Sequence, residues 1–200
     1  MKETLTRQGV SALTVHGTAL AGLLAAVSTH AHKGEDLPTL NAVRVWTSEG
    51  RLYAAATDRY RLIEGYCDIV KEGEGEEELA PTLIRLADIK RIVSLVPAKG
   101  RLVFNATISR AGDMVSVAYG SDSLTLTAWD GQFPPYEHLI PTGEPVPLSG
   151  IMFNPTYFAD YGKIVGKNQP VGVRFYGENK PIGIDLGEGW RALLMPMRKR

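Results

Sequence analysis

The sequence has little cysteine and no long apolar run, and each of these absences excludes a class of protein. Cys67 is the one cysteine, so no disulfide can form within the chain, and a reducing compartment fits. The longest apolar stretch, Ala19–Val27, is much shorter than the roughly 20 residues that a membrane-spanning helix needs. Residues 1–10 lack the apolar core of a signal peptide. We therefore expect a cytoplasmic protein.

An excess of charge of one sign is also missing. Lys and Arg together number 22, and Asp and Glu together number 22, so the formal net charge is zero. A protein that grips nucleic acid tightly usually carries a basic excess. The balance therefore argues against tight neutralisation of phosphates, although it permits a surface that DNA slides past. The hydrophobic fraction of 44% is ordinary for a globular protein of this length.

Residue patterns for catalysis or metal binding are sparse. Asp58 is the obvious single carboxylate, and nothing near it in sequence pairs it with a base or a nucleophile, so we interpret it as a turn-stabilising residue. His30 and His32 have no second group of ligands at a familiar spacing, which favours an exposed helix end. The acidic segment 71–78 reads as a mobile loop, because it lacks the alternating oxygen ligands of a calcium site. We expect no catalytic residue, no metal and no cofactor.

The sequence does contain one pattern that repeats three times: a short strand, a helix, then a run of strands. The expected helices, each with its capping residue, are 18–31 with Thr18, 83–96 with Thr82, and 155–165 with Asn154. The segments with alternating polarity, read as strands, are 42–46, 52–56, 60–66, 102–108, 114–119, 124–128, 171–176, 182–186 and 192–197. Each helix is too short to be stable alone, so we expect it to pack on the neighbouring antiparallel sheet in an α+β fold.

Four segments, in this order along the chain, carry a resemblance to a known family. They are ATDRYRL at 56–62, GQFPPY at 131–136 followed by LIP at 139–141, FNP at 153–155, and LMPMR at 194–198. They resemble signature segments of the beta subunit of bacterial DNA polymerase III, the sliding clamp. The resemblance implies the DNA-clamp fold, with three strand–helix–strands units and the helices on one face of antiparallel sheets.

The resemblance also implies a domain organisation. Residues 1–141 resemble the complete middle domain of the family, made of two units, and residues 148–200 resemble the C-terminal half of the last domain. The Pro-rich segment 140–147 would link them. The family's first domain and the remaining half-domain have no counterpart, which implies a shortened form. A family ring contains twelve units, so four three-unit copies reach the same count. If neighbouring units alternate in direction, a dimer of dimers satisfies this count and a simple fourfold ring does not.

The implied function is that of a processivity factor, which encircles duplex DNA as a homo-oligomeric ring without sequence preference and catalyses nothing. Polymerase and clamp-loader peptides would dock in a hydrophobic groove. The positions that match the family's groove are Leu40, Thr57, Tyr60, Arg61, Leu62, Pro141, Leu193, Met195, Pro196, Met197 and Arg198. We expect Arg61 and Arg198 to hold carbonyl or acidic groups at its edge. The alternative is that these leucine, methionine and proline residues belong to an ordinary hydrophobic core and bind no partner.

DNA contact is expected from the helices, which line the hole in the family. The candidate DNA-facing residues are Lys33, Lys90, Arg91, Lys163 and Lys167. A thin scatter of positive charge attracts phosphates without a fixed register, which allows sliding. The alternative is an ordinary solvated face. A second functional hypothesis is an interaction module that regulates replication by occupying clamp-partner peptides or by joining a full-length clamp.

Overall fold

The computed structural model describes residues 11–70, 79–96, 104–148 and 150–198. The helices are α1 (Gly17–Ser28), α2 (Leu86–Leu95) and α3 (Pro155–Val165), with a short 3₁₀ turn at Glu137–Leu139. The strands are β1 (Ser11–His16), β2 (Ala42–Ser48), β3 (Arg51–Thr57), β4 (Arg61–Asp68), β5 (Thr82–Arg85), β6 (Asn105–Ala111), β7 (Met114–Tyr119), β8 (Asp122–Thr127), β9 (Gly172–Arg174), β10 (Ile182–Asp185) and β11 (Trp190–Leu194). The predicted acidic loop at 71–78 lies outside the described residues.

The three expected units are present, and the first two interlock. The first unit is β1, α1 and β2–β4, the second is β5, α2 and β6–β8, and the third is α3 with β9–β11. The strand that leads into each of the first two helices pairs with the other unit: β1 lies antiparallel to β6, and β5 lies antiparallel to β2. The two sheets therefore cannot separate without breaking both units.

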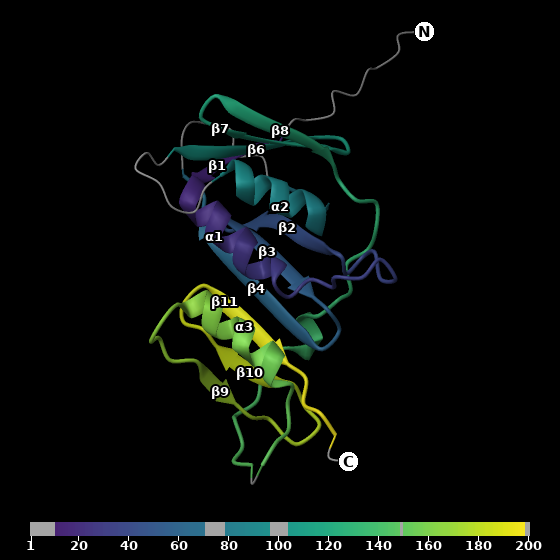
Figure 1. Ribbon diagram of the computed structural model, residues 1–200, viewed down its shortest axis with the longest axis vertical. Helices are drawn as coiled ribbons and strands as arrows, with labels where there is room; N and C mark the ends of the chain where they lie inside the picture. The colour runs from purple at the N-terminus through teal and green to yellow at the C-terminus, as the bar shows by residue number, and fades with distance from the viewer. Residues whose placement is uncertain (1–10, 71–78, 97–103, 149, 199–200) are drawn as a thin grey trace.

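A seven-stranded sheet contains strands of both the first and the third unit and joins them. Its order is β5-β2-β3-β4-β11-β10-β9, beside a four-stranded sheet of order β1-β6-β7-β8. The junction is the antiparallel pair β4 and β11, in which Leu62 lies opposite Leu193. Figure 1 shows the result as an elongated molecule, with the second unit at one end, the third unit at the other, and the helices layered on the sheets.

Alternation along the long sheet gives it two different apolar faces. Ile63 and Leu194 point to the helix side and join the large core formed with α1, α2 and the four-stranded sheet. Leu62 and Leu193, one residue away, point to the opposite face. There they pack with Phe133 and other side chains of the connector that follows β8. This second, smaller cluster supports the candidate site.

Two helix starts differ from the predictions. The predicted helix at 83–96 with Thr82 as its cap is wrong at its beginning, because Thr82–Arg85 forms β5 and the helix starts at Leu86. Pairing with β2 and burial of the strand outweigh the local helical signal. The predicted cap Thr18 is also wrong: α1 starts at Gly17, directly after β1, without a side-chain cap. A Cβ at Gly17 would lie 2.7 Å from the carbonyl oxygen of Phe104, so only glycine fits this junction.

The third helix begins as predicted. Asn154 precedes it, and the Asn154 Oδ1 accepts a hydrogen bond from the backbone N–H of Thr156 at 2.9 Å. Pro155 occupies the first helical position, where the missing N–H has no partner to lose. The cap and the proline are both local signals, which is why this start was readable from the sequence.

Candidate functional site

The turn between β3 and β4 is organised by Asp58. Its Oδ1 accepts the backbone N–H groups of Tyr60 and Arg61, each at 3.1 Å, and the Thr57 hydroxyl donates to the Arg61 carbonyl at 2.7 Å. Arg59 adopts a positive φ of 79° at the corner. The interpretation of Asp58 as a turn-stabilising residue is confirmed. The turn leaves the ring of Tyr60 projecting, with 56% of the residue exposed.

The C-terminal segment runs alongside this turn. The Met195 N–H donates to the Tyr60 carbonyl at 2.8 Å, and the Met197 N–H donates to the Met152 carbonyl at 2.7 Å. Met195 and Met197 are 37% and 55% exposed. Flexible methionines beside a tyrosine form an adaptable apolar surface of the kind that accepts extended peptides. We call Tyr60, Met195 and Met197 the rim.

A buried apolar cluster, which we call the floor, begins two residues after Tyr60 on β4 and two residues before Met195 on β11. Leu62 and Leu193 are 4% and 6% exposed and pack with Phe133 and Tyr136. The Tyr136 hydroxyl donates to Glu64 Oε2, and Arg191 Nε lies 3.6 Å from Glu64 Oε1. Burial first, and then the Glu64 carboxylate, raise the pKa of Tyr136 far above its ordinary value. This anchor fixes the connector to the sheet and thereby shapes the floor.

The predicted groove residues divide into three groups. Tyr60, Met195, Met197 and Arg198 are exposed, Pro141 and Pro196 are half-buried, and Leu40, Thr57, Arg61, Leu62 and Leu193 are buried. Leu40 is buried outside both apolar clusters. Met197 and Arg198 also line a small cavity of about 150 Å³ together with Met152. The sequence resemblance did not single out Phe133, Tyr136 and Glu64 as supports of the floor.

Arg61 is placed differently from the prediction that it would hold a partner's groups. Its side chain is only 4% exposed, and every guanidinium nitrogen has a partner within the chain. Nε donates to Asp58 Oδ2 at 2.9 Å, Nη1 to Asp160 Oδ2 at 2.6 Å, and Nη2 to the Thr29 carbonyl at 2.8 Å. The planar fork suits this divergent pairing, which joins the turn to α1 and α3. Arg61 is therefore a positioning residue for the rim.

Asp160 completes this ionic cluster from α3. It also accepts a hydrogen bond from Lys163 Nζ at 2.7 Å. Burial by itself would raise the pKa of Asp160, but the hydrogen bonds from Arg61 and Lys163 outweigh it and hold the pKa below its usual value. The carboxylate therefore stays charged, and the third unit is tied to the first by an ion pair as well as by the β4–β11 junction.

His30 is fully buried, so the prediction of an exposed helix end is wrong for this residue. Its ring lies 4.8 Å from the ring of Tyr161. The single hydroxyl proton of Thr29 goes to the Ala26 carbonyl at 2.7 Å, so His30 Nδ1, at 2.7 Å, must be the donor to Thr29. Nε2 is then unprotonated, and it has no partner within the part of the chain that the structure describes. Burial, and then the nearby Arg61, lower the pKa of His30 to about 3.

Acidification is expected to destabilise the protein through His30. The unfolded state takes up a proton near the ordinary pKa of 6.5 and the folded state only near about 3, so stability falls as the pH falls between these values. The slope from one such group is at most about 1.4 kcal/mol per pH unit. Urea unfolding between pH 7.5 and 5 should show a shallower pH dependence for His30→Gln than for the unmodified chain. His138→Gln, the control at an exposed histidine, should keep the full slope; equal slopes for all three would contradict this assignment.

The predicted DNA-facing cations are all exposed, but two of them carry a counter-ion. Arg91 pairs with Asp88 at 2.8 Å, and Lys163 pairs with Asp160 at 2.7 Å, each three residues earlier on its helix. The remaining candidates, Lys33, Lys90 and Lys167, have no ion-pair partner among the described residues. These three are therefore the cations most available to phosphates.

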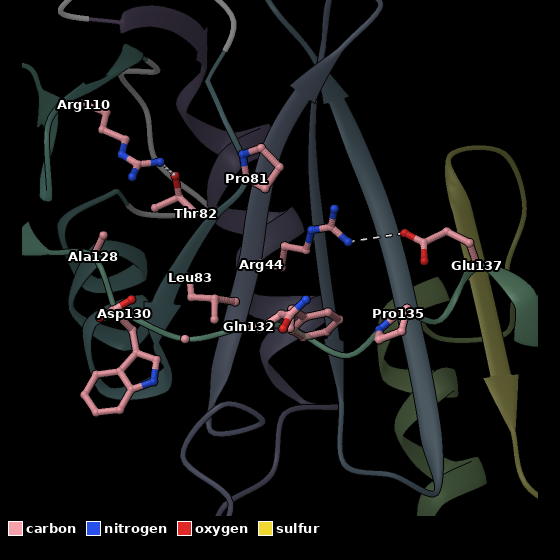
Figure 2. A pocket seen from close by; sticks show the side chains of 13 residues that line it. Arg44, Pro81, Thr82, Leu83, Arg110, Ala128, Asp130, Gln132, Pro135 and Glu137 are labelled. Atoms are coloured by element: carbon pink, nitrogen blue, oxygen red, sulfur yellow. Dashed lines mark hydrogen bonds and ion pairs between the residues drawn. The ribbon is translucent and has the colours of Figure 1, made fainter. Parts of the chain in front are cut away.

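A larger pocket of about 500 Å³ lies away from the rim. It is bounded by β2, β5 and the connector after β8, as Figure 2 shows. Arg44 Nη1 and Glu137 Oε1 face each other across it at 3.3 Å, and Arg110 Nη1 donates to the Thr82 hydroxyl at 2.6 Å. None of the predicted groove residues lines it. Two pairs of its polar side chains, Arg44 with Glu137 and Arg110 with Thr82, are bonded to each other, whereas the buried Trp129 Nε1 in its wall has no partner among the described residues.

Two other kinds of site are absent from the described part of the chain. Among the described residues, no three His, Cys, Asp or Glu side chains gather closely enough to hold a metal ion. Within the same residues, no helix is both long and apolar enough to cross a membrane. Cys67 is buried, and burial raises the pKa of its thiol to about 12, which makes it a poor nucleophile.

The fold is that of the bacterial DNA sliding clamps. The chain superimposes on DNA polymerase III beta subunit from Thermotoga maritima with a TM-score of 0.81 and 18% identity, covering 100% of this chain and 68% of that one. It superimposes on the beta sliding clamp of Caulobacter crescentus with a TM-score of 0.79 and 20% identity, covering 99% and 69%. These likenesses confirm the predicted α+β clamp fold.

The amino-acid sequence is similar to that of a particular clamp as well. It is 28% identical to the beta sliding clamp of Micrococcus luteus over 134 residues, which are 66% of this chain and 42% of that protein. The resemblance read from the four segments is therefore confirmed. The chain matches less than half the length of this relative. No protein-family model matches the sequence.

Proposed function

We propose that this protein is a DNA sliding clamp, which encircles duplex DNA, retains a polymerase on it and has no catalysis of its own. The observation that supports this most is the exposed rim of Tyr60, Met195 and Met197, which the Met195–Tyr60 backbone hydrogen bond brings together next to the buried residues Leu62 and Leu193. Exposed apolar side chains over a rigid, sheet-borne base suit the capture of a short extended peptide. Polymerase and clamp-loader peptides are the proposed ligands, and the cytoplasm is the proposed location.

The proposed ring forms by self-association through sheet edges. The edge strands are β1 and β8 in one sheet and β5 and β9 in the other, and β1 and β5 each carry an isolated bridge to another segment. Among the described residues β8 and β9 have no such bridge, and Figure 1 shows these two edges at opposite ends of the molecule. A chain with an open edge at each end can be joined to further copies without altering its own sheets. We favour a tetramer over a trimer or dimer, since four copies supply twelve units. Residues 1–141 would be one complete domain and 148–200 half of another, joined across β4 and β11.

The function is tested by primer extension on primed circular DNA with the cognate polymerase and loader. Long products that require this protein are the expected result. Peptide binding without any stimulation would overturn the clamp function and favour the alternative, a module that occupies clamp-partner peptides or joins a longer clamp. Release from closed circles, but not from linear DNA, should be slow, because a closed ring is retained by topology and slides off free ends.

The DNA-facing surface gives a prediction of its own. Reversing Lys90 and Lys167 together to Glu should shorten retention on nicked circular DNA and flatten its salt dependence, by about one unit of log–log slope for each phosphate that is no longer neutralised. Peptide affinity should not change. Lys180→Glu, an exposed lysine in the turn between β9 and β10, is the matched control. Retention that is equal in the double variant and the control would show that Lys90 and Lys167 are ordinary solvated side chains.

A further inference from the structure

The three units share a small backbone contact, and its position relative to the helix and the last strand is the same in each unit. In each unit, a residue just before the helix forms an isolated antiparallel bridge with a residue just after the last strand. The bridges are Val15 with Ile69, Leu83 with Trp129, and Met152 with Met197. The segment before α3 therefore lies where a leading strand lies in the other two units.

In the first two units the leading strand makes a second, longer contact. It adds to the first strand after the helix of the other unit: β1 pairs with β6 along its length, and β5 pairs with β2. The bridging residues define the register. Val15 lies opposite Ala106, the second residue of β6, and Leu83 lies opposite Arg44, the third residue of β2.

The third unit lacks both halves of this exchange. Its leading segment, 151–153, has only the Met152 bridge within the described part of the chain. The strand that corresponds to β2 and β6 is β9, and it is the edge of the sheet with all three residues exposed. The connector is bonded to the residue that follows β9, where the Val146 N–H donates to the Phe175 carbonyl at 2.8 Å.

The exposed groups on the two sides match each other. Met152 and Val173 are large apolar residues that are 48% and 36% exposed. Arg174, the one charge on β9, is already paired with Asp185 at 2.6 Å. The edge therefore carries neither the unpaired charge nor the proline with which single chains usually block strand addition. Moreover, α1 and α2 pack together, whereas α3 has no comparable helix neighbour among the described residues.

We propose that the third units of two copies complete each other by exchanging their leading segments. Residues 151–153 of each copy add to β9 of the other, so that Met152 lies opposite the middle of the partner's β9. The joint has two-fold symmetry, because each copy gives and receives the same element. This inference specifies one interface of the proposed ring and rests on that self-association.

The two-fold joint also accounts for an odd number of units in each copy. Two copies joined through β9 form a six-unit arc with a β8 edge at each end. Two such arcs can then meet through their β8 edges and close a twelve-unit ring. The chains alternate in direction around it, so the assembly is a dimer of dimers. A simple fourfold arrangement would place β9 against β8, where no leading segment is available to add.

Disulfide trapping in the full chain tests the joint. The variant combines Cys67→Ala with Met152→Cys and Val173→Cys. Directly opposed antiparallel residues have Cα atoms about 4.5–5.5 Å apart, within the disulfide range of about 4.4–6.8 Å. Mild oxidation should give a covalent dimer as the main product, and either single-cysteine variant should give much less. A mixture of isotopically light and heavy chains should yield hybrid dimers. A disulfide within one chain, or no dimer, overturns the proposal.

Charge exchange provides a second readout that does not depend on oxidation. In Met152→Glu with Val173→Glu, like charges face each other twice across the joint, and sedimentation should show at least about a tenfold weaker dimer. In Met152→Glu with Val173→Lys, opposite charges face each other and association should persist. Equal behaviour of the two variants overturns the exchange. If the cysteine variant does not cross-link but still stimulates the polymerase fully, this joint is wrong and the clamp function stands. If the dimer is trapped but never stimulates the polymerase, the clamp function is wrong and the joint stands.

Discussion

Replacing Arg61 with methionine is expected to lower the free energy of unfolding by about 3–5 kcal/mol, the range for removing one partner of a buried ion pair. The change leaves Asp58 without its cation and Asp160 with only the exposed Lys163, and it leaves the Thr29 carbonyl without its donor. The loss is larger than that for a surface pair because the Arg61 side chain is only 4% exposed. Urea unfolding at pH 7.5 measures it.

Arg191→Met is the matched control for Arg61. Arg191 also lies near a carboxylate, with Nε at 3.6 Å from Glu64, but its side chain is 65% exposed, so the loss should stay below about 1 kcal/mol. Adding Asp58→Asn and Asp160→Asn to Arg61→Met should recover part of the stability, because the uncompensated charges are removed. If Arg61→Met costs no more than Arg191→Met, the ionic cluster does not hold the turn.

Substituting Met197 and Arg198 together by alanine is expected to weaken peptide binding at least about a hundredfold. Truncation of a central anchor at a small interface commonly costs about 2 kcal/mol or more, and this variant removes both an apolar anchor and an edge charge. Met197 is 55% exposed and Arg198 is also exposed, so the folded chain loses little packing. Fluorescence anisotropy with a labelled peptide from the cognate polymerase measures the affinity.

Met114→Ala is the control for the rim. Met114 is a 41% exposed methionine at the start of β7, on the four-stranded sheet. It should leave peptide affinity unchanged, while both variants keep the unfolding midpoint of the parent chain. Retained affinity in the Met197→Ala, Arg198→Ala variant would refute the groove assignment. If that variant has a much lower unfolding midpoint, Tyr60→Ala, which removes an exposed turn side chain and its stacking on Tyr157, replaces it as the test.

The parts of the fold that were predictable from the sequence are those with local causes. The start of α3 follows from adjacent residues, Asn154 and Pro155, and the turn at Asp58 is closed by residues two and three positions away. The β5 strand was missed because its partner β2 lies about forty residues earlier, and nothing in 82–85 itself opposes a helix.

The candidate site shows the same division. The rim was found through a resemblance to known segments, and those segments do meet in space. The role of Arg61 was missed because its carboxylate partner Asp160 is 99 positions away. The Tyr136–Glu64 contact spans 72 positions, and no short motif reports such a pair. A residue type can be read from a motif, but what it touches is decided by the register of distant strands.

The exchange of leading strands sets an order for folding. In the pairing of β1 with β6, His16 lies opposite Asn105, which is 89 positions later, so β1 cannot complete its hydrogen-bonded ladder until β6 has been synthesised. Non-local pairing of this kind slows folding and leaves an aggregation-prone strand unpaired until its partner is available. A nascent fragment that ends before β6 would therefore expose the unpaired backbone groups of β1. We expect it to require chaperone protection during synthesis.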